Sequence, residues 1–478
     1  MRFKDLEIVA AGLIGLSSYL ITGDVLVTVS LFVLWIVYKL VASDDGLLVL
    51  PLAMTFHWMQ GTIGVLYLGF LGRSVKTAND TDYQPMVLIA LGCNLALAAG
   101  IYLGLRMRRD TDALPRPEHA FSFGQIVAAY ILTVGFEGSI LVIAPMYPTI
   151  RQILVTIDFA RLGILYLLLR RLTTPRIRGE LIALVVAGEV VLGITGFFAG
   201  FREPLVLAAL AFLEVFDRRN KRHVAALIAL SVASAVLAIV WMGIRSQYRR
   251  EYLEVDQFAA SRSARVDRVR DLSGDFLNNT ENLWATADAV VDRMWAVGYP
   301  AMALKRVPSV IAHTDGAIIR AALLHIVTPR VFFPNKPEMP SDSDEVRKYS
   351  GIFVAGREVN TSIAFGYSIE SYIDFGLPWM FVPVFLYGVF VGFCYALFRQ
   401  LIRHRDLSVA FLTVTFWISV YILERSWATM LGINVGFLVY LGAPTVLLDR
   451  FLLIRAPAQP VVDDSPPALV AADQYRAP

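Results

Sequence analysis

The sequence has few of the side chains that proteins use for metal binding and redox chemistry. Its 478 residues include two cysteines, Cys93 and Cys394, and six histidines, none of them spaced as CxxC, HExxH or HxH. Both cysteines lie inside apolar runs, where we expect them to pack as small hydrophobic side chains. The sequence therefore lacks a disulfide framework and predicts neither a metal site nor a cofactor.

Charged residues are also scarce. They make up 17% of the chain, whereas a soluble domain has roughly a quarter. Hydrophobic residues make up 56%, the mean hydropathy is +0.59, and the net charge of +3 is small for this length. This balance argues against a nucleic-acid partner, which would call for a strongly basic surface, and predicts an integral membrane protein surrounded by lipid.

Long apolar runs divide the chain into about twelve predicted spans, since a helix needs about 20 mainly apolar residues to cross a bilayer. The predicted spans are residues 7–22, 25–42, 46–72, 85–105, 125–147, 152–170, 179–200, 204–217, 223–245, 376–398, 407–424 and 429–453. The pattern predicts an all-α polytopic membrane protein. A helix carries all its backbone hydrogen bonds internally, as the hydrocarbon requires.

Arginine and lysine residues collect after the even-numbered spans. The clusters are Arg106, Arg108, Arg109 and Arg116; Arg170, Arg171, Arg176 and Arg178; Arg218, Arg219, Lys221 and Arg222; and Arg399, Arg403 and Arg405. Because basic loops stay in the cytoplasm, this alternation predicts cytoplasmic termini and a large loop outside. We expect four parts: a bundle at 1–245, the loop at 246–367, three further spans at 368–455, and a disordered tail at 456–478.

The large loop is predicted to be mostly helical. Apolar residues recur at helical spacing between residues 254 and 297, whereas the prolines from Pro329 to Pro340 exclude a regular helix there. We expect this loop to form a small domain of its own, with amphipathic faces on the membrane or on the bundle.

Ionisable residues in or near the spans are candidates for function, because burying charge in a bilayer is expensive. Arg161 follows Asp158 by three residues, so it either forms an ion pair with Asp158 or contacts substrate. Arg245 and Arg249 are four residues apart where the ninth span ends, and share a face at the level of the lipid headgroups.

Arg202 lies within the sequence TGFFAGFREP at residues 195–204, at the outer end of the seventh predicted span. A guanidinium is permanently charged and can contact two phosphate oxygens at once, so Arg202 is a candidate for binding the diphosphate of a lipid carrier. The alternative is that Arg202 extends to the interface with Glu203 as its partner.

Two further segments carry the most specific pattern. Residues 328–337 read TPRVFFPNKP, and residues 362–376 read SIAFGYSIESYIDFG. With the Gly-Phe-Arg element at 200–202, they resemble the oligosaccharide repeat-unit polymerases of bacterial surface polysaccharide synthesis, the Wzy-type or O-antigen polymerase family. An aspartate stands at position 374, where the family commonly has asparagine.

The resemblance implies a GT-C-like membrane glycosyltransferase that uses neither metal nor nucleotide sugar. Such an enzyme acts at the periplasmic face of the bacterial inner membrane. It transfers a growing glycan from one undecaprenyl diphosphate to a lipid-linked repeat unit, and a flippase and a chain-length regulator are candidate protein partners. In this reading Glu370 is the base, with Tyr372 beside it. The candidate cations and other substrate contacts are Arg161, Arg202, Arg245, Arg249, Arg330, Lys336 and Asp374.

Other readings remain open at this point. An O-antigen ligase shares the donor chemistry and differs in the acceptor, and a flippase or transporter can also have a dozen spans. Arg330 and Lys336 could instead fold the loop, Glu370 could instead cap or anchor a helix, and Glu424 with Arg425 forms a further charged pair at the outer end of the eleventh span.

Overall fold

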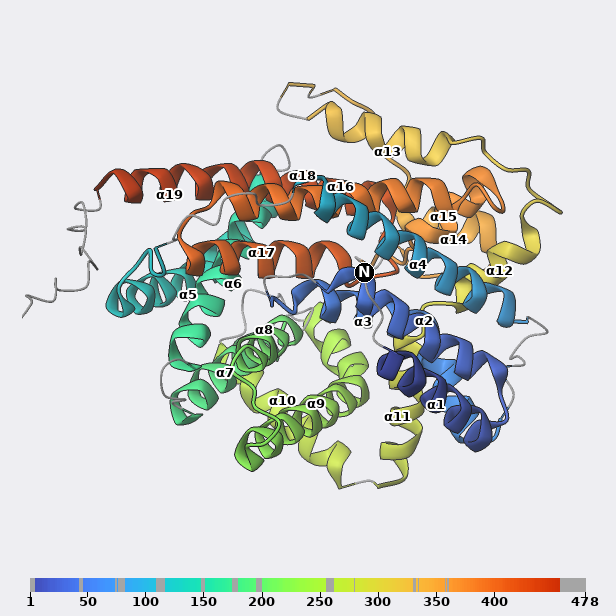
Figure 1. Cartoon of the computed structure of the whole chain (residues 1–478), viewed down its shortest axis with the longest axis horizontal. Coiled ribbons are helices and arrows are strands. Elements are labelled where there is room, and N and C mark those ends of the chain that lie inside the picture. The colour runs from blue at the N-terminus through green and yellow to red at the C-terminus, as the bar shows by residue number, and fades with distance from the viewer. Residues whose placement is uncertain are drawn as a thin grey trace, which may run out of the picture.

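The computed structural model is mainly helical in the part of the chain that it describes (Figure 1). The described residues are 5–42, 46–73, 75, 82–108, 117–147, 151–173, 179–194, 200–254, 262–278, 280–329, 332–333, 335–356, 358 and 361–455. No β-strand occurs among them. The all-α prediction is therefore confirmed for these residues.

Nine helices form the N-terminal half. They are α1 (Asp5–Thr22), α2 (Val25–Val41), α3 (Val49–Phe70), α4 (Gln84–Met107), α5 (Phe123–Met146), α6 (Arg151–Thr173), α7 (Gly179–Ile194), α8 (Arg202–Leu213) and α9 (Lys221–Glu254). The last of these continues nine residues past the predicted end of the ninth span at 245, so both Arg245 and Arg249 lie inside a helix.

The remaining helices comprise the loop and the C-terminal part. They are α10 (Arg262–Leu277), α11 (Thr280–Met294), α12 (Gly298–Arg306), α13 (Ala317–Val327), α14 (Asp342–Ser350), α15 (Tyr367–Phe375), α16 (Phe381–Leu401), α17 (Arg405–Val420), α18 (Trp427–Gly436), a π-helical segment (Phe437–Gly442) and α19 (Ala443–Arg455). Each of the twelve predicted spans thus overlaps a helix.

Four helical segments in the described residues are long and apolar enough to cross a membrane, judged by length and composition. They are Gln84–Met107, Lys221–Glu251, Phe381–Leu401 and Trp427–Leu452. Their apolar length matches the roughly 30 Å of hydrocarbon that a spanning helix must cross. The structure therefore has the helices of a membrane protein.

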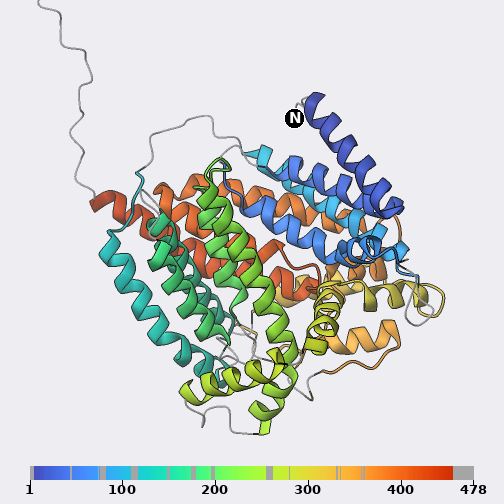
Figure 2. The same cartoon turned by 90° about the horizontal axis from the view of Figure 1, so that it is seen from below.

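The closest helix pair joins the two halves of the chain. The α4 and α16 helices carry the matching sequences Gly100-x-x-x-Gly104 and Gly388-x-x-x-Gly392. A Cβ atom on Gly100 would lie 2.1 Å from the Phe385 carbonyl oxygen, and one on Gly392 would lie 2.2 Å from the Ile101 carbonyl oxygen. Only glycine permits this backbone approach, which is a common way for membrane helices to associate. Figure 2 shows the N-terminal and C-terminal helices interleaved in one bundle.

The large loop packs onto the bundle. The α11 helix contacts α3 and α9, and α13 contacts α18. Loop residues such as Val297 and Ala303 belong to the same buried apolar cluster as the bundle residues. The helices predicted between 254 and 297 are present as α10 and α11, while residues 255–261 lie outside the described part.

Candidate functional site

The turn between α17 and α18, residues 421–426, is the centre of the candidate site. Gln60 of α3 holds the turn with its side-chain amide: Nε2 donates to the Tyr421 carbonyl oxygen at 2.5 Å, and Oε1 accepts from the Leu423 N–H at 3.1 Å. Gly366, at a φ of +95°, lets the start of α15 approach this turn, because a Cβ there would lie 2.3 Å from the Leu423 carbonyl oxygen. Segments far apart in sequence therefore meet at one turn.

Arg202 lies on the cationic side of the turn. Its Nη2 donates to Glu203 Oε1 at 2.8 Å and to the Tyr421 hydroxyl, and its guanidinium lies 4.9 Å from the centre of the Tyr421 ring. The Tyr421 hydroxyl in turn donates to Glu203 Oε1 at 3.1 Å. The Arg202 side chain is still 54% exposed. The expected partnership with Glu203 is present, and enough of the guanidinium faces outward to contact a ligand.

A second group of cations lies beside the same turn. Arg245 is close enough to Arg249 and Arg293 for their positive charges to repel, and Arg293 Nη1 lies 3.1 Å from Glu424 Oε2 in the turn. Among the described residues, no carboxylate lies within ion-pair distance of Arg245. Three like charges held close together create a local positive field that favours an anion, and the Glu424 carboxylate offsets part of it.

Arg425 is a further cation on the Arg202 side of the turn. The Arg425 guanidinium lies 5.6 Å from the centre of the Tyr421 ring and donates a hydrogen bond to the Ile418 carbonyl oxygen. Arg202 and Arg425 also repel one another. Thus Arg202 and Arg425 lie against the Tyr421 ring, whereas Arg245 and Arg249 lie close to Arg293, which pairs with Glu424 in the same turn. The sequence did not single out Arg293 or Arg425 as phosphate ligands.

Glu370 lies on the other side of the turn, where the turn leads into α18. Its Oε2 accepts the backbone N–H of Trp427 at 2.7 Å, and its side chain is buried. Burial raises the pKa of Glu370 to about 8, the Trp427 N–H opposes that shift, and the negative charges of Asp342 and Glu345 add to it. Oε1 accepts no hydrogen bond from the described residues. One carboxylate oxygen of Glu370 thus anchors the start of α18.

The other two residues of the same motif bind the chain itself. The Tyr372 hydroxyl donates to the Val307 carbonyl oxygen at 3.0 Å. The buried carboxylate of Asp374 accepts the backbone N–H groups of Ile318 and Ile319 at 3.0 and 2.9 Å. It therefore caps the start of α13 in the way that an N-cap residue does. Asp374 and Tyr372 position helices here, and neither is brought to the arginines.

The motif at residues 328–337 is described in part. Arg330 lies outside the described residues, so its predicted role stays a prediction. Lys336 donates from Nζ to the His325 carbonyl oxygen at 2.8 Å, close to the end of α13. This bond satisfies a carbonyl at a helix C-terminus, where a cation is favoured. The observed contact is the loop-folding role that the sequence left open.

Arg161 is held within the bundle. Its Nη1 donates to both carboxylate oxygens of Glu189, at 2.8 and 2.6 Å, and the Tyr130 hydroxyl donates to the same carboxylate at 2.6 Å. The charge of Asp158 also acts on Arg161. The prediction of a simple pair with Asp158 is thus incomplete, since the closest partner lies on α7. This group joins α5, α6 and α7 away from the 421–426 turn.

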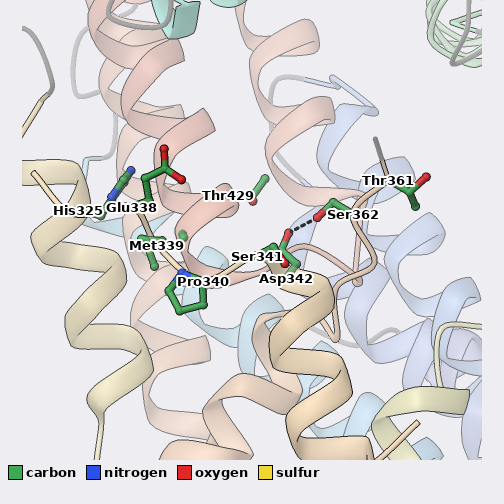
Figure 3. Close-up of a pocket in the computed structure, with 10 residues that line it drawn as sticks. His325, Glu338, Met339, Pro340, Ser341, Asp342, Thr361, Ser362 and Thr429 are labelled. Atoms are coloured by element: carbon green, nitrogen blue, oxygen red, sulfur yellow. Dashed lines mark hydrogen bonds between the residues drawn. The ribbon is translucent and has the colours of Figure 1, made fainter. Parts of the chain in front are cut away.

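A pocket of about 480 Å³ opens beside the start of α18 (Figure 3). It is lined by His325, Glu338, Met339, Pro340, Ser341, Asp342, Thr361, Ser362, Ala428 and Thr429. In Figure 3, His325 and Glu338 lie on one side, Asp342 and Ser362 on the other, and Thr429 between them. The Ser362 hydroxyl donates to Asp342 Oδ2 at 3.1 Å.

Comparison with known families matches residues 70–402 to a domain of unknown function, DUF8712. The chain belongs to the DUF8712 family. Comparisons with curated proteins and with solved structures found no match.

The DUF8712 match covers α4 to α16 and so includes Arg202, Arg245, Arg249 and Glu370. It ends before the 421–426 turn around which these residues gather. No group of three or more His, Cys, Asp or Glu side chains suited to a metal ion occurs in the described ranges.

Sequence reasoning missed Arg293, Tyr421 and Gln60. Arg293 lies on the polar side of an amphipathic helix, and Tyr421 directly follows the apolar helix α17, where an aromatic residue is common. Gln60 contacts residues about 360 positions away in the chain. No local signal distinguishes these side chains from their many ordinary counterparts.

Proposed function

We propose that this protein polymerises oligosaccharide repeat units linked to undecaprenyl diphosphate at the periplasmic face of the bacterial inner membrane. The observation that carries the proposal is the 421–426 turn, which has arginines on one side and the buried Glu370 on the other. Glycosyl transfer from a lipid diphosphate needs charge stabilisation on the leaving group and a base near the attacking hydroxyl.

The chemistry can be assigned atom by atom. The acceptor hydroxyl oxygen attacks the anomeric carbon of the donor glycan, and the bond from that carbon to the diphosphate oxygen breaks. The electron pair leaves with the diphosphate, where Arg202, Arg245 and Arg249 offset the developing charge. Glu370 takes the proton from the hydroxyl, using the carboxylate oxygen that is not bonded to Trp427.

The proposal includes a membrane arrangement that goes beyond the four candidate spanning helices. It has about twelve spans in a GT-C-like bundle, both termini in the cytoplasm, and the loop at 246–367 outside. In support, every predicted span overlaps a helix and the basic clusters follow alternate helices. Lipid-linked donor and acceptor, a flippase and a chain-length regulator would be its partners.

Deleting the gene and separating the surface polysaccharide on a gel tests this function. A polymerase predicts glycan capped with single repeat units, restored to a full ladder by the wild-type gene and not by a Glu370→Gln gene. Polymer that accumulates without attachment would instead indicate a ligase, and unflipped precursor would indicate a transporter. An unchanged polysaccharide ladder would refute all three assignments.

A further inference from the structure

The pocket beside α18 has a composition unlike that of the arginine side of the turn. Hydroxyl groups come from Ser341, Thr361, Ser362 and Thr429, and carboxylates come from Glu338 and Asp342. No lysine or arginine lines it, among the residues that the structure describes. Its volume of about 480 Å³ is within the roughly 300–1,000 Å³ typical of small-molecule sites.

These groups match the hydroxyl-rich surface of a sugar. A sugar hydroxyl can donate to a carboxylate and accept from the Thr429 hydroxyl, whose oxygen accepts from Ser426. The hydroxyls of Ser341 and Ser362 already donate to Asp344 and Asp342, so their oxygens can only accept from a sugar. Two carboxylates facing one pocket also create a negative potential. A ligand that carries its own carboxylate or phosphate would meet like charges there, which weakens its binding.

The pocket is placed next to Glu370. Its wall includes Ala428 and Thr429, which follow directly after the Trp427 whose N–H bonds to Glu370. The negative charge of Asp342 in the opposite wall acts on the same carboxylate. A sugar bound in the pocket would therefore lie on the base side of the turn, whereas an anionic diphosphate is drawn to the arginine side.

We propose that this pocket binds a sugar residue of the acceptor glycan that carries no acid group, such as a neutral hexose or an N-acetylhexosamine, and rejects hexuronic acids. This inference rests on the proposed function and adds to it the charge class of the acceptor sugar. The pocket and its hydroxyl and carboxylate lining carry it, independently of the arginines.

Saturation-transfer NMR on the purified full-length protein in detergent tests the proposal. The probe is an equimolar mixture of the methyl glycosides of glucose, galactose, N-acetylglucosamine, glucuronic acid and galacturonic acid. We expect signal from one or more of the three uncharged glycosides, and about tenfold less from both hexuronides because of charge repulsion.

Two variants locate the binding. The double variant Glu338→Gln with Asp342→Asn removes both charges and keeps the hydrogen-bonding shape, so the hexuronide signal should rise to within about threefold of the best uncharged glycoside. Thr429→Val removes one hydroxyl and no charge, so it should weaken the uncharged signal several-fold and leave the hexuronides rejected. The exposed Asp275→Asn on α10 removes a charge outside the pocket and should change nothing.

Three results would overturn the inference: no signal from any glycoside, hexuronide signal equal to the best uncharged signal in the wild type, or signals that neither pocket variant alters. Failure of the proposed function has a different signature. In that case the gene deletion leaves the polysaccharide ladder unchanged, whereas the NMR signals and their dependence on Glu338 and Asp342 persist.

Discussion

At the scale of single residues, Arg202 and Glu370 carry the most specific chemistry. Arg202 shares one nitrogen between Glu203 and Tyr421 and leaves about half of its side chain exposed. Glu370 shares one oxygen with the backbone of Trp427. In both cases contacts within the protein hold the side chain in place, and the proposed function requires that its remaining polar atoms meet substrate.

Replacing Arg202 separates a phosphate ligand from an interfacial anchor. A lysine keeps the charge but loses the fork that contacts two phosphate oxygens, so Arg202→Lys should reduce polymer formation and Arg202→Ala should reduce it further. Loss of a charged hydrogen bond costs about 1.5–3 kcal/mol, which is roughly ten- to a hundredfold in rate. Polymer length on gels and protein abundance on blots would be measured together.

The control is Arg219→Ala, which removes an exposed arginine from the turn before α9. It should leave polymer length unchanged. Normal polymer from Arg202→Lys at normal abundance would remove Arg202 from the site and leave Arg245, Arg249 and Arg293 as the phosphate ligands.

Glu370→Gln distinguishes a base from a helix cap. Glutamine can still accept the Trp427 N–H, so the fold should survive, but it cannot take a proton, so activity should fall about 100-fold or more. In the wild type, activity should rise with pH and level off above about pH 8, because the base must be ionised and burial raises its pKa to about 8. Wild-type activity in the glutamine variant would leave Glu370 as a cap alone.

The same pKa shift makes a prediction for stability. Burial raises the pKa of the folded Glu370 from 4.5 to about 8, so the folded protein holds a proton that the unfolded chain releases between these values. The contribution of this group to stability is therefore fully present below about pH 4.5 and is lost as pH rises through 8. Thermal unfolding midpoints should fall over this range in the wild type, and less so in Glu370→Gln.

At the scale of elements, the contact between α4 and α16 fixes the position of the preceding helix α15, which carries Glu370. The matching glycines let the two backbones touch, as described for Gly100 and Gly392. The α15 helix, which carries Glu370, directly precedes α16 in the chain. The close helix pair is therefore a rigid support on which the base side of the site rests.

Gly100→Ala should destabilise the protein, since its Cβ would lie 2.1 Å from the Phe385 carbonyl oxygen and the helices would have to separate. Overpacking of this kind costs about 1–3 kcal/mol. The matched control is Gly163→Ala in α6, where a Cβ meets nothing within 4 Å and helix propensity favours alanine by about 0.5–1 kcal/mol. Unfolding midpoints in detergent would compare the two, and an equal or higher midpoint for Gly100→Ala would contradict the close contact.

At the scale of the whole molecule, the candidate site needs residues from nearly the full length of the chain. Gln60, Arg202, Arg293, Glu370 and Glu424 come from the first bundle, the loop and the C-terminal helices. The site therefore exists only when the loop is docked on the bundle.

Cysteine labelling tests on which side of the membrane the loop at 246–367 lies. In a background with Cys93 and Cys394 replaced by alanine, Ser309→Cys between α12 and α13 should react with an impermeant maleimide in intact spheroplasts. Arg218→Cys, in the turn between α8 and α9, should react only after permeabilisation. The reverse pattern would invert the topology and place the arginines and Glu370 on the cytoplasmic side.

The sequence by itself determined the helical, membrane-type character of this protein. An apolar run of some 20 residues is a local property, and each predicted span overlaps a helix in the structure. The sequence also made Arg202 and Glu370 candidates, because an arginine in a Gly-Phe-Arg element and a glutamate within a family-like motif stand out in a mostly apolar chain.

Only the tertiary structure decided which of these residues meet. It gathered Arg202, Arg245 and Arg249 with Arg293 around one turn, and it assigned Asp374 to capping α13. Neither outcome follows from local sequence, because the role of a carboxylate or guanidinium depends on its partners. These partners lie tens to hundreds of residues away in the chain. Charge and hydrogen bonding act through space, so the same side chains become ligands or caps according to how the helices pack.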